Sequence, residues 1–121
     1  TFLVVDCGGG TVDLTMRTLL PGNRLKEETL RTGDLCGSTY IDQEFLKFMS
    51  RILGSSALQK IRTYAYGDLQ KLVHGFFCKK VKTGFTGDPD NYNTIELDFE
   101  GECRSLMKYI TGRERTELEK K

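Results

Sequence analysis

The sequence predicts a mixed α/β fold, and three patterns support this prediction. Short apolar or alternating segments fill the first third of the 121 residues, and two stretches with apolar residues every three or four positions follow. A strictly alternating segment then appears late in the chain. The resulting order of three strands, two helices, a strand and a helix is typical of layered α/β structures. We therefore expect a three-stranded antiparallel meander followed by helices and a further strand.

Three short strands joined by tight turns are predicted at the start of the chain. Residues 2–5 form a continuous apolar run, which indicates a strand buried on both faces. Residues 11–16 alternate in polarity, and residues 20–23 include Pro, Gly and Asn, which favour turns. Residues 24–30 resume an extended pattern, and residues 32–37 are expected to form a loop.

Two amphipathic helices are predicted in the middle of the chain. The first covers residues 39–53, and its apolar stripe is expected to lie in the core rather than to form a groove for a partner. The second covers residues 67–81, with Asp68 in the first turn, where an acidic side chain is favoured. Ser55 or Ser56 is expected to cap a short helical piece between them.

The last third of the chain is predicted to hold a loop, a strand and a charged helix. Residues 83–91 contain several residues that break helices, and residues 94–99 alternate strictly in polarity. The tail from residue 102 is helical in character and highly charged. We therefore expect the further strand at residues 94–99 and a solvated helix after it.

The overall composition narrows the class of protein. The net charge is +1, which differs from the strong basic excess of general nucleic-acid or membrane-surface binders. No apolar run approaches the roughly 20 residues that span a bilayer, and no basic-then-apolar leader is visible. We therefore expect a cytoplasmic protein with no nucleic-acid and no membrane partner. Because Thr1 directly precedes an apolar strand, we also expect a fragment of a longer protein.

The cysteines and the single histidine predict no metal site. Cys7, Cys36, Cys78 and Cys103 include no C-x-x-C pair, and His74 is the only histidine. Reduced thiols are the default in the cytosol. We therefore expect all four cysteines to be buried as small apolar residues.

Residues 6–13, with the sequence DCGGGTVD, carry the most chemical information. Glycine N–H groups can approach a ligand closely, and successive exposed N–H groups form a concave, partly positive nest that suits a phosphate. The Thr11 hydroxyl adds a donor, and Asp6 follows a strand, where it can hold a cation or an attacking water. These groups together predict a site for phosphate with a divalent cation.

Two other phosphate motifs do not fit these residues. No G-K-[ST] follows the glycines, as it would in a strand–loop–helix phosphate loop. A strand is predicted after them, whereas a G-x-G-x-x-G dinucleotide motif opens a helix. A glycine-rich hairpin that binds nothing is the remaining alternative, and two acids, a hydroxyl and three glycines within eight residues argue against it.

Residues 5–14 resemble the second phosphate motif of the 70-kilodalton heat-shock chaperones, which belong to the actin–hexokinase ATPase superfamily. Residues 33–42 are similar to the segment that follows the third strand in that family. Residues 6–15, together with residues 109–112 (YITG), look most like a divergent branch of the family. The resemblance covers nearly the whole chain and is strongest over residues 2–20.

The resemblance implies a place for the chain in a larger domain. Residues 1–121 would be the second-lobe portion of an actin-like (ribonuclease H-like) ATPase domain. About residues 1–31 would form the phosphate-binding meander, and residues 39–121 would form a helical/β subdomain that supplies one wall of the adenosine pocket.

The resemblance also implies roles for the turn. Asp6 would hold Mg²⁺ through water and help to position the attacking water, and Thr11 would hydrogen-bond the γ-phosphate. From its position on the second strand, Asp13 is expected to be structural and to brace the hairpin by accepting backbone N–H bonds. Gly8, Gly9 and Gly10 would line the phosphates with their N–H groups. Gly37 would lie near the α-phosphate or the ribose.

For the adenosine, the resemblance implies that Lys82 contacts the ribose and Thr86 lies near the adenine. Three positions depart from the family pattern. Lys79 stands where ordinary members have a ribose-binding Glu, and Thr83 stands where they have an Arg that stacks on adenine. Ser38 replaces the second glycine of a pair. All three departures lie outside residues 6–13.

The parent protein implied by this resemblance would bind ATP with Mg²⁺ and open or close a cleft between two lobes. It would be chaperone-like, with protein clients or co-chaperones as further partners. Two alternatives remain open at this point. One is a sugar or metabolite kinase of the same superfamily, and the other is a degenerate, non-hydrolysing interaction module that kept the fold and lost the nucleotide.

The chain alone is expected to show no measurable ATPase activity. Phosphoryl transfer depends on several groups that act together, and the family's first phosphate hairpin and catalytic lysine are not found in these 121 residues. Phosphate release from Mg-ATP by the purified chain is the measurement. Turnover that disappears in Asp6→Asn would overturn this expectation.

Overall fold

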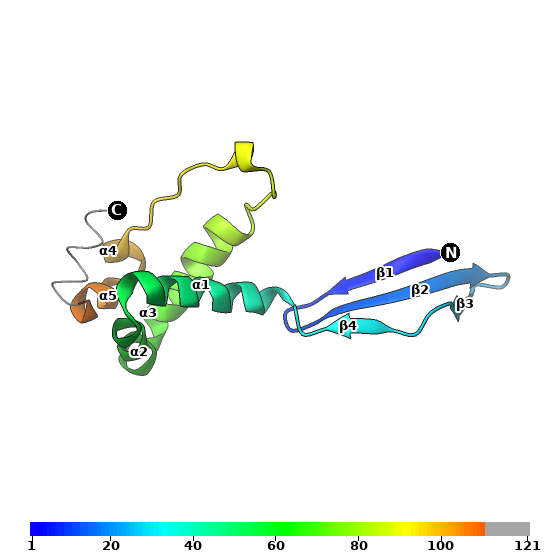
Figure 1. The fold of residues 1–121 in the computed structure, drawn as a ribbon, viewed down its shortest axis with the longest axis horizontal. Coiled ribbons are helices and arrows are strands. Elements are labelled where there is room, and N and C mark those ends of the chain that lie inside the picture. Colours follow the sequence, from blue (N-terminus) through cyan, green and yellow to red (C-terminus); the bar gives the residue numbers. More distant parts are fainter. Residues whose placement is uncertain (111–121) are drawn as a thin grey trace. The chain divides into compact units, whose positions relative to one another are not determined.

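The computed structural model describes residues 1–110, and Figure 1 shows their fold. The chain divides into two compact units, residues 1–43 and the residues from 44 onward. The first unit holds the strands and the first turns of helix α1 (Ser38–Leu53), and the second holds the remaining helices. Each unit is described by itself.

The first unit is an antiparallel sheet built around one long central strand. Strand β2 pairs with β1 along one edge, and with β3 and then β4 along the other. The predicted three-stranded meander is confirmed, but residues 32–37 are only partly a loop, because residues 32–34 pair with β2. The strands are β1 (Phe2–Cys7), β2 (Val12–Leu20), β3 (Arg24–Glu27) and β4 (Thr32–Asp34).

The expectation that residues 2–5 are buried on both faces is wrong for this structure. Phe2, Leu3, Val4 and Val5 have exposed fractions of 44, 54, 38 and 54%. An apolar run predicts burial only if a second layer covers the sheet. The described residues of the first unit supply strands and the first turns of α1, so they do not build such a layer over both faces.

The second unit is helical, and the two predicted amphipathic helices are confirmed with small differences. Helix α1 begins one residue before the predicted start, and residues 66–82 form a short α-helix that continues as a π-helix. Neither Ser55 nor Ser56 caps the short helix that lies between the two predicted helices. That helix begins at Ser55 itself, and the residue before it is Gly54, with a φ of 87°. The elements are α2 (Ser55–Tyr64), α3 (Tyr66–Gln70), η1 (Lys71–Lys82), η2 (Pro89–Asn91), α4 (Phe99–Glu102) and α5 (Arg104–Tyr109).

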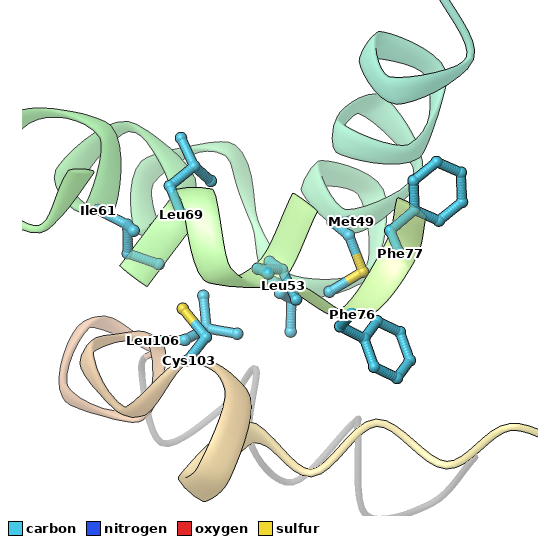
Figure 2. Packing of buried hydrophobic residues seen from close by; sticks show 9 residues of the cluster. Met49, Leu53, Ile61, Leu69, Phe76, Phe77, Cys103 and Leu106 are labelled. Atoms are coloured by element: carbon cyan, nitrogen blue, oxygen red, sulfur yellow. The ribbon is translucent and has the colours of Figure 1, made fainter. Parts of the chain in front are cut away.

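The core of the second unit joins the C-terminal half of α1 to the later helices (Figure 2). Met49 and Leu53 of the predicted apolar stripe are buried, and the rings of Phe45 and Phe77 stack with centroids 4.1 Å apart. The expectation that the stripe belongs to the core is therefore confirmed at these positions. The buried cluster is Met49, Leu53, Ile61, Leu69, Leu72, Phe76, Phe77, Cys103 and Leu106.

The further strand predicted at residues 94–99 is not formed. Residues 92–98 have no regular secondary structure, and Phe99 begins α4. Alternation of polarity is a necessary pattern for a half-buried strand, but a strand also needs a partner with which to form a ladder. No described residue pairs with this segment, since the sheet contains only β1 to β4. The predicted charged tail is helical over α5, and residues 111–121 lie outside the described residues.

The carboxylate of Asp68 fastens α3 to the start of α5. It accepts hydrogen bonds from the backbone N–H (3.2 Å) and the hydroxyl of Ser105, and it lies 3.5 Å from the Lys71 ammonium. A carboxylate at the start of a helix satisfies N–H groups that have no partner within the helix. The hydrogen bonds from Ser105 lower the pKa of Asp68.

Asp68→Asn is expected to destabilise the second unit by about 1 kcal/mol at neutral pH, as loss of a helix cap does. Because the pKa is lowered in the folded state, this stabilisation is present above the unfolded pKa and is lost as the pH falls through the folded value. Thermal unfolding should therefore separate the wild type from D68N at pH 7 and much less at strongly acid pH. Asp90→Asn, at an exposed position of η2, is the control, and an equal loss in both variants would contradict the assignment.

Candidate functional site

The glycine turn, residues 8–11, joins β1 to β2 and is the candidate site. The Gly8 N–H donates to the Thr11 carbonyl over 2.9 Å and closes the turn. Gly9, Gly10 and Thr11 are exposed, so a ligand can reach them. The turn lies against the start of α1 within the first unit.

The carbonyls of the three glycines accept hydrogen bonds from the residues that begin α1. A helix start presents N–H groups that have no partner inside the helix, and here the turn supplies acceptors for them. A fourth bond comes from the Thr39 hydroxyl, which donates to the Gly9 carbonyl over 2.7 Å. The backbone pairs are Gly37 N–H to Gly10 O (3.2 Å), Ser38 N–H to Gly8 O (3.0 Å) and Thr39 N–H to Gly9 O (2.9 Å).

These bonds determine where the N–H groups of the turn point. In a planar trans peptide, a carbonyl and the next N–H point in opposite directions, and no described peptide bond is cis. Because the glycine carbonyls point toward α1, the N–H groups of Gly9, Gly10 and Thr11 point away from it. None of these three donates a hydrogen bond within residues 1–110. From the sequence, we expect the N–H groups of Gly8, Gly9 and Gly10 to face a ligand. The Gly8 N–H donates inside the turn instead, so the outward N–H groups are those of the next three residues.

Gly37 is a glycine because the backbone of the turn occupies the space of a side chain. A β-carbon at this position would lie 2.6 Å from the carbonyl carbon of Gly10 and closer still to Gly9. Gly37 is buried. The structure thus gives Gly37 a packing contact with the turn, and a contact with the α-phosphate or ribose stays a prediction.

Two aspartates face each other across β1 and β2, directly beside the turn. Asp6 pairs with Asp13, and residues opposite each other in an antiparallel ladder share a face. The Asp13 carboxylate accepts the Thr11 hydroxyl over 3.1 Å, rather than the backbone N–H groups that were expected, and it overlies Gly33. The Asp6 side chain is exposed and has no hydrogen-bond or ion-pair partner in the described part of the chain.

The residues implied for adenosine lie in the second unit. Lys82 ends η1, and Thr86 follows in an exposed loop. The Thr86 hydroxyl oxygen accepts the Asp88 N–H over 3.3 Å, and the exposed rings of Phe85 and Tyr92 stack in the same loop with centroids 5.8 Å apart. The structure thus gathers the turn, Asp6, Asp13 and Gly37 in one unit, and it places Lys82 and Thr86 in the other.

The cysteines do not follow the expectation of general burial. Cys103 is buried, and burial raises the pKa of its thiol, but Cys7 and Cys36 are exposed. Cys7 ends β1, whose apolar residues are also exposed, and Cys36 lies between β4 and α1. None of the four cysteines forms a disulfide bond within residues 1–110. Within residues 1–110, no group of three His, Cys, Asp or Glu side chains could hold a metal ion.

The helices of the described part offer no membrane span, because none is both long and apolar enough. The fold is a mixed α/β arrangement, with an antiparallel sheet followed by helices. Such an arrangement, with a glycine turn between the first two strands, is consistent with part of an actin-like ATPase lobe.

Comparison with known proteins narrows this class. Over 97 residues, 79% of its length, the chain is 42% identical to the heat shock 70 kDa protein 12A of mouse and of human. Over 72 residues, 56% of its length, it is 38% identical to human heat shock 70 kDa protein 12B. The chain is therefore similar to the heat shock 70 kDa protein 12 branch of the 70-kilodalton heat-shock proteins, as the motif predicted. It spans about 14% of the length of the 12A relatives and 10% of 12B. No protein-family model matches the chain, and no solved structure matches it.

Gly37→Ala is expected to loosen the contact between the turn and α1. The added β-carbon would meet backbone atoms that no rotamer change can move, and overpacking of this kind costs about 1–3 kcal/mol. Hydrogen exchange of the Ser38 and Thr39 amides should become faster. Gly10→Ala is the matched control, since its β-carbon would meet nothing within 4 Å. Unchanged exchange in G37A would show that the turn does not depend on the close approach.

Proposed function

We propose that the chain is part of a heat-shock-70-like ATP-binding domain and that its glycine turn binds the terminal phosphates of Mg-ATP. The single observation behind this proposal is the row of outward N–H groups at Gly9, Gly10 and Thr11. Successive N–H donors that converge without internal partners form an anion-binding nest. The similarity to heat shock 70 kDa protein 12A and 12B, together with the phosphate motif, makes a nucleotide the natural source of that anion.

Thr11 would contribute through its side chain as well. Its hydroxyl donates to Asp13 in this structure, and rotation about one bond would turn the same proton toward a phosphate oxygen. Asp13 would then accept the hydroxyl proton when no phosphate is bound and keep the hydroxyl close to the site. This arrangement supports the γ-phosphate role proposed for Thr11.

The residues present fit a magnesium ion. Asp6 and Asp13 oppose each other on one face, and like charges placed directly opposite in a sheet repel unless a cation lies nearby. Mg²⁺ typically keeps several waters and takes one or two carboxylates together with substrate phosphates. Asp6, whose carboxylate is exposed and without a partner in the described residues, would hold the ion through water. The ion would supply charge neutralisation for the phosphates.

Thr86 and Lys82 are the residues proposed for the adenosine. The Thr86 oxygen already accepts a backbone N–H, so its own hydroxyl proton can be donated to a ring nitrogen of adenine. Lys82 would contact the ribose, and Gly37 would lie near the α-phosphate or ribose. These assignments rest on the family motif, and the hydroxyl geometry of Thr86 supports one of them.

For the parent protein, we propose nucleotide-driven opening and closing of two lobes in a chaperone-like, cytoplasmic protein. The chain would contribute the second-lobe portion, and catalysis with Asp6 and Thr11 would require the remaining groups of the domain. Protein clients or co-chaperones would act through other parts of the parent.

Titration of the ¹⁵N-labelled chain with tripolyphosphate, with and without Mg²⁺, tests the proposal. The amide signals of Gly9, Gly10 and Thr11 should shift, and Mg²⁺ should tighten the binding. Asp6→Asn should reduce that tightening by about threefold or more, equivalent to roughly 0.7 kcal/mol. Without ligand, the same change should slow hydrogen exchange in β1, because it removes a like-charge pair.

Asp34→Asn is the control, because Asp34 pairs with Val12 and therefore lies on the other face of the sheet. It should change neither the magnesium effect nor the exchange in β1. If tripolyphosphate shifts only lysine-rich segments and leaves the turn unchanged, the turn is not the phosphate site.

A further inference from the structure

We infer that Thr39 is a positioning residue for the phosphate site, because it holds the Gly9–Gly10 peptide in the orientation that aims the Gly10 N–H at a ligand. This inference rests on the proposed phosphate-binding function. It adds a residue that the sequence motif does not include, since Thr39 follows the predicted turn by 28 residues or more.

The Gly9 carbonyl is the most strongly held acceptor of the turn. It accepts both the N–H of Thr39 over 2.9 Å and the hydroxyl of Thr39 over 2.7 Å. The carbonyls of Gly8 and Gly10 each accept one N–H from the start of α1. A single residue therefore supplies both donors to the central peptide of the turn.

Two donors on one carbonyl have a geometric and an electronic effect. Rotation of the Gly9–Gly10 peptide plane would break both bonds at once, so the Gly10 N–H keeps its direction away from α1. Hydrogen bonds in a chain also polarise one another, so a carbonyl with two donors makes the N–H of the same peptide a better donor. Glycines on both sides would otherwise allow this plane to rotate freely.

The Thr39 side chain offers a hydroxyl and a methyl group, and their contributions can be separated. The methyl carbon lies 3.6 Å from the position that a β-carbon on Gly9 would take, so it is close to the turn as well. Thr39→Val keeps the shape and removes the hydroxyl. Thr39→Ser keeps the hydroxyl and removes the methyl group.

The test measures Mg-tripolyphosphate affinity and the Gly10 amide signal in the wild type, T39V and T39S. We expect T39V to bind about threefold to tenfold more weakly, the effect of one neutral hydrogen bond. T39S should bind within about twofold of the wild type, because it restores the donor. In ligand-free T39V, the Gly10 amide signal should shift and exchange faster, while the melting temperature stays close to that of the wild type.

Thr63→Val is the matched control. Its hydroxyl also donates to a backbone carbonyl, that of Gln59, over 2.9 Å, but it lies in α2 of the second unit. T63V should leave tripolyphosphate affinity and the Gly10 signal unchanged.

The possible outcomes separate this inference from the proposed function. If the wild type binds tripolyphosphate at the turn and T39V binds equally well, the positioning role is refuted while the function stands. If the wild type does not bind, both are refuted. Weakening of equal size in T39V and T39S, or loss of the folded first unit in T39V, would make Thr39 a structural residue and overturn the inference.

Discussion

The contact between the start of α1 and the glycine turn is the interaction on which the candidate site depends. A helix must find acceptors for its first N–H groups, and a turn of three glycines must find donors for its carbonyls. Here each satisfies the other through Gly37, Ser38 and Thr39. These hydrogen bonds also determine the direction of the neighbouring amides. Since every glycine carbonyl points toward the helix, the amides that follow are left pointing outward as a group.

This contact explains why the site needs residues from two places in the sequence. The turn lies between β1 and β2, whereas the residues that donate hydrogen bonds to it, Gly37, Ser38 and Thr39, follow β4. Strand β4 pairs with β2 on the edge opposite β1. The pairing of Asp13 with Gly33 brings the end of β4, and hence the start of α1, next to the turn. A short strand of three residues thereby determines where the helix begins relative to the turn.

The sequence predicted the elements whose information is local. The meander and the helices followed from alternation, turn residues and three- and four-residue periods, and the turn itself from its glycines and acids. It did not predict features that depend on distant partners. Strand β4 forms because β2 has an open edge, and residues 94–99 form no strand because no described strand pairs with them. In the site, the Gly8 N–H donates to Thr11, and Thr39 donates to the Gly9 carbonyl. No local sequence pattern predicts either hydrogen bond.

Gly33 carries a consequence for the charge balance beside the turn. Its missing side chain leaves room for the Asp13 carboxylate, whose Oδ1 atom lies 2.6 Å from the place a β-carbon would occupy. Any larger residue at position 33 would displace that carboxylate. One direction in which it could move is toward Asp6 on β1. The absence of a side chain on β4 thus affects the spacing of two negative charges, Asp13 on the adjacent strand β2 and Asp6 on β1 beyond it, without Gly33 contacting a ligand itself.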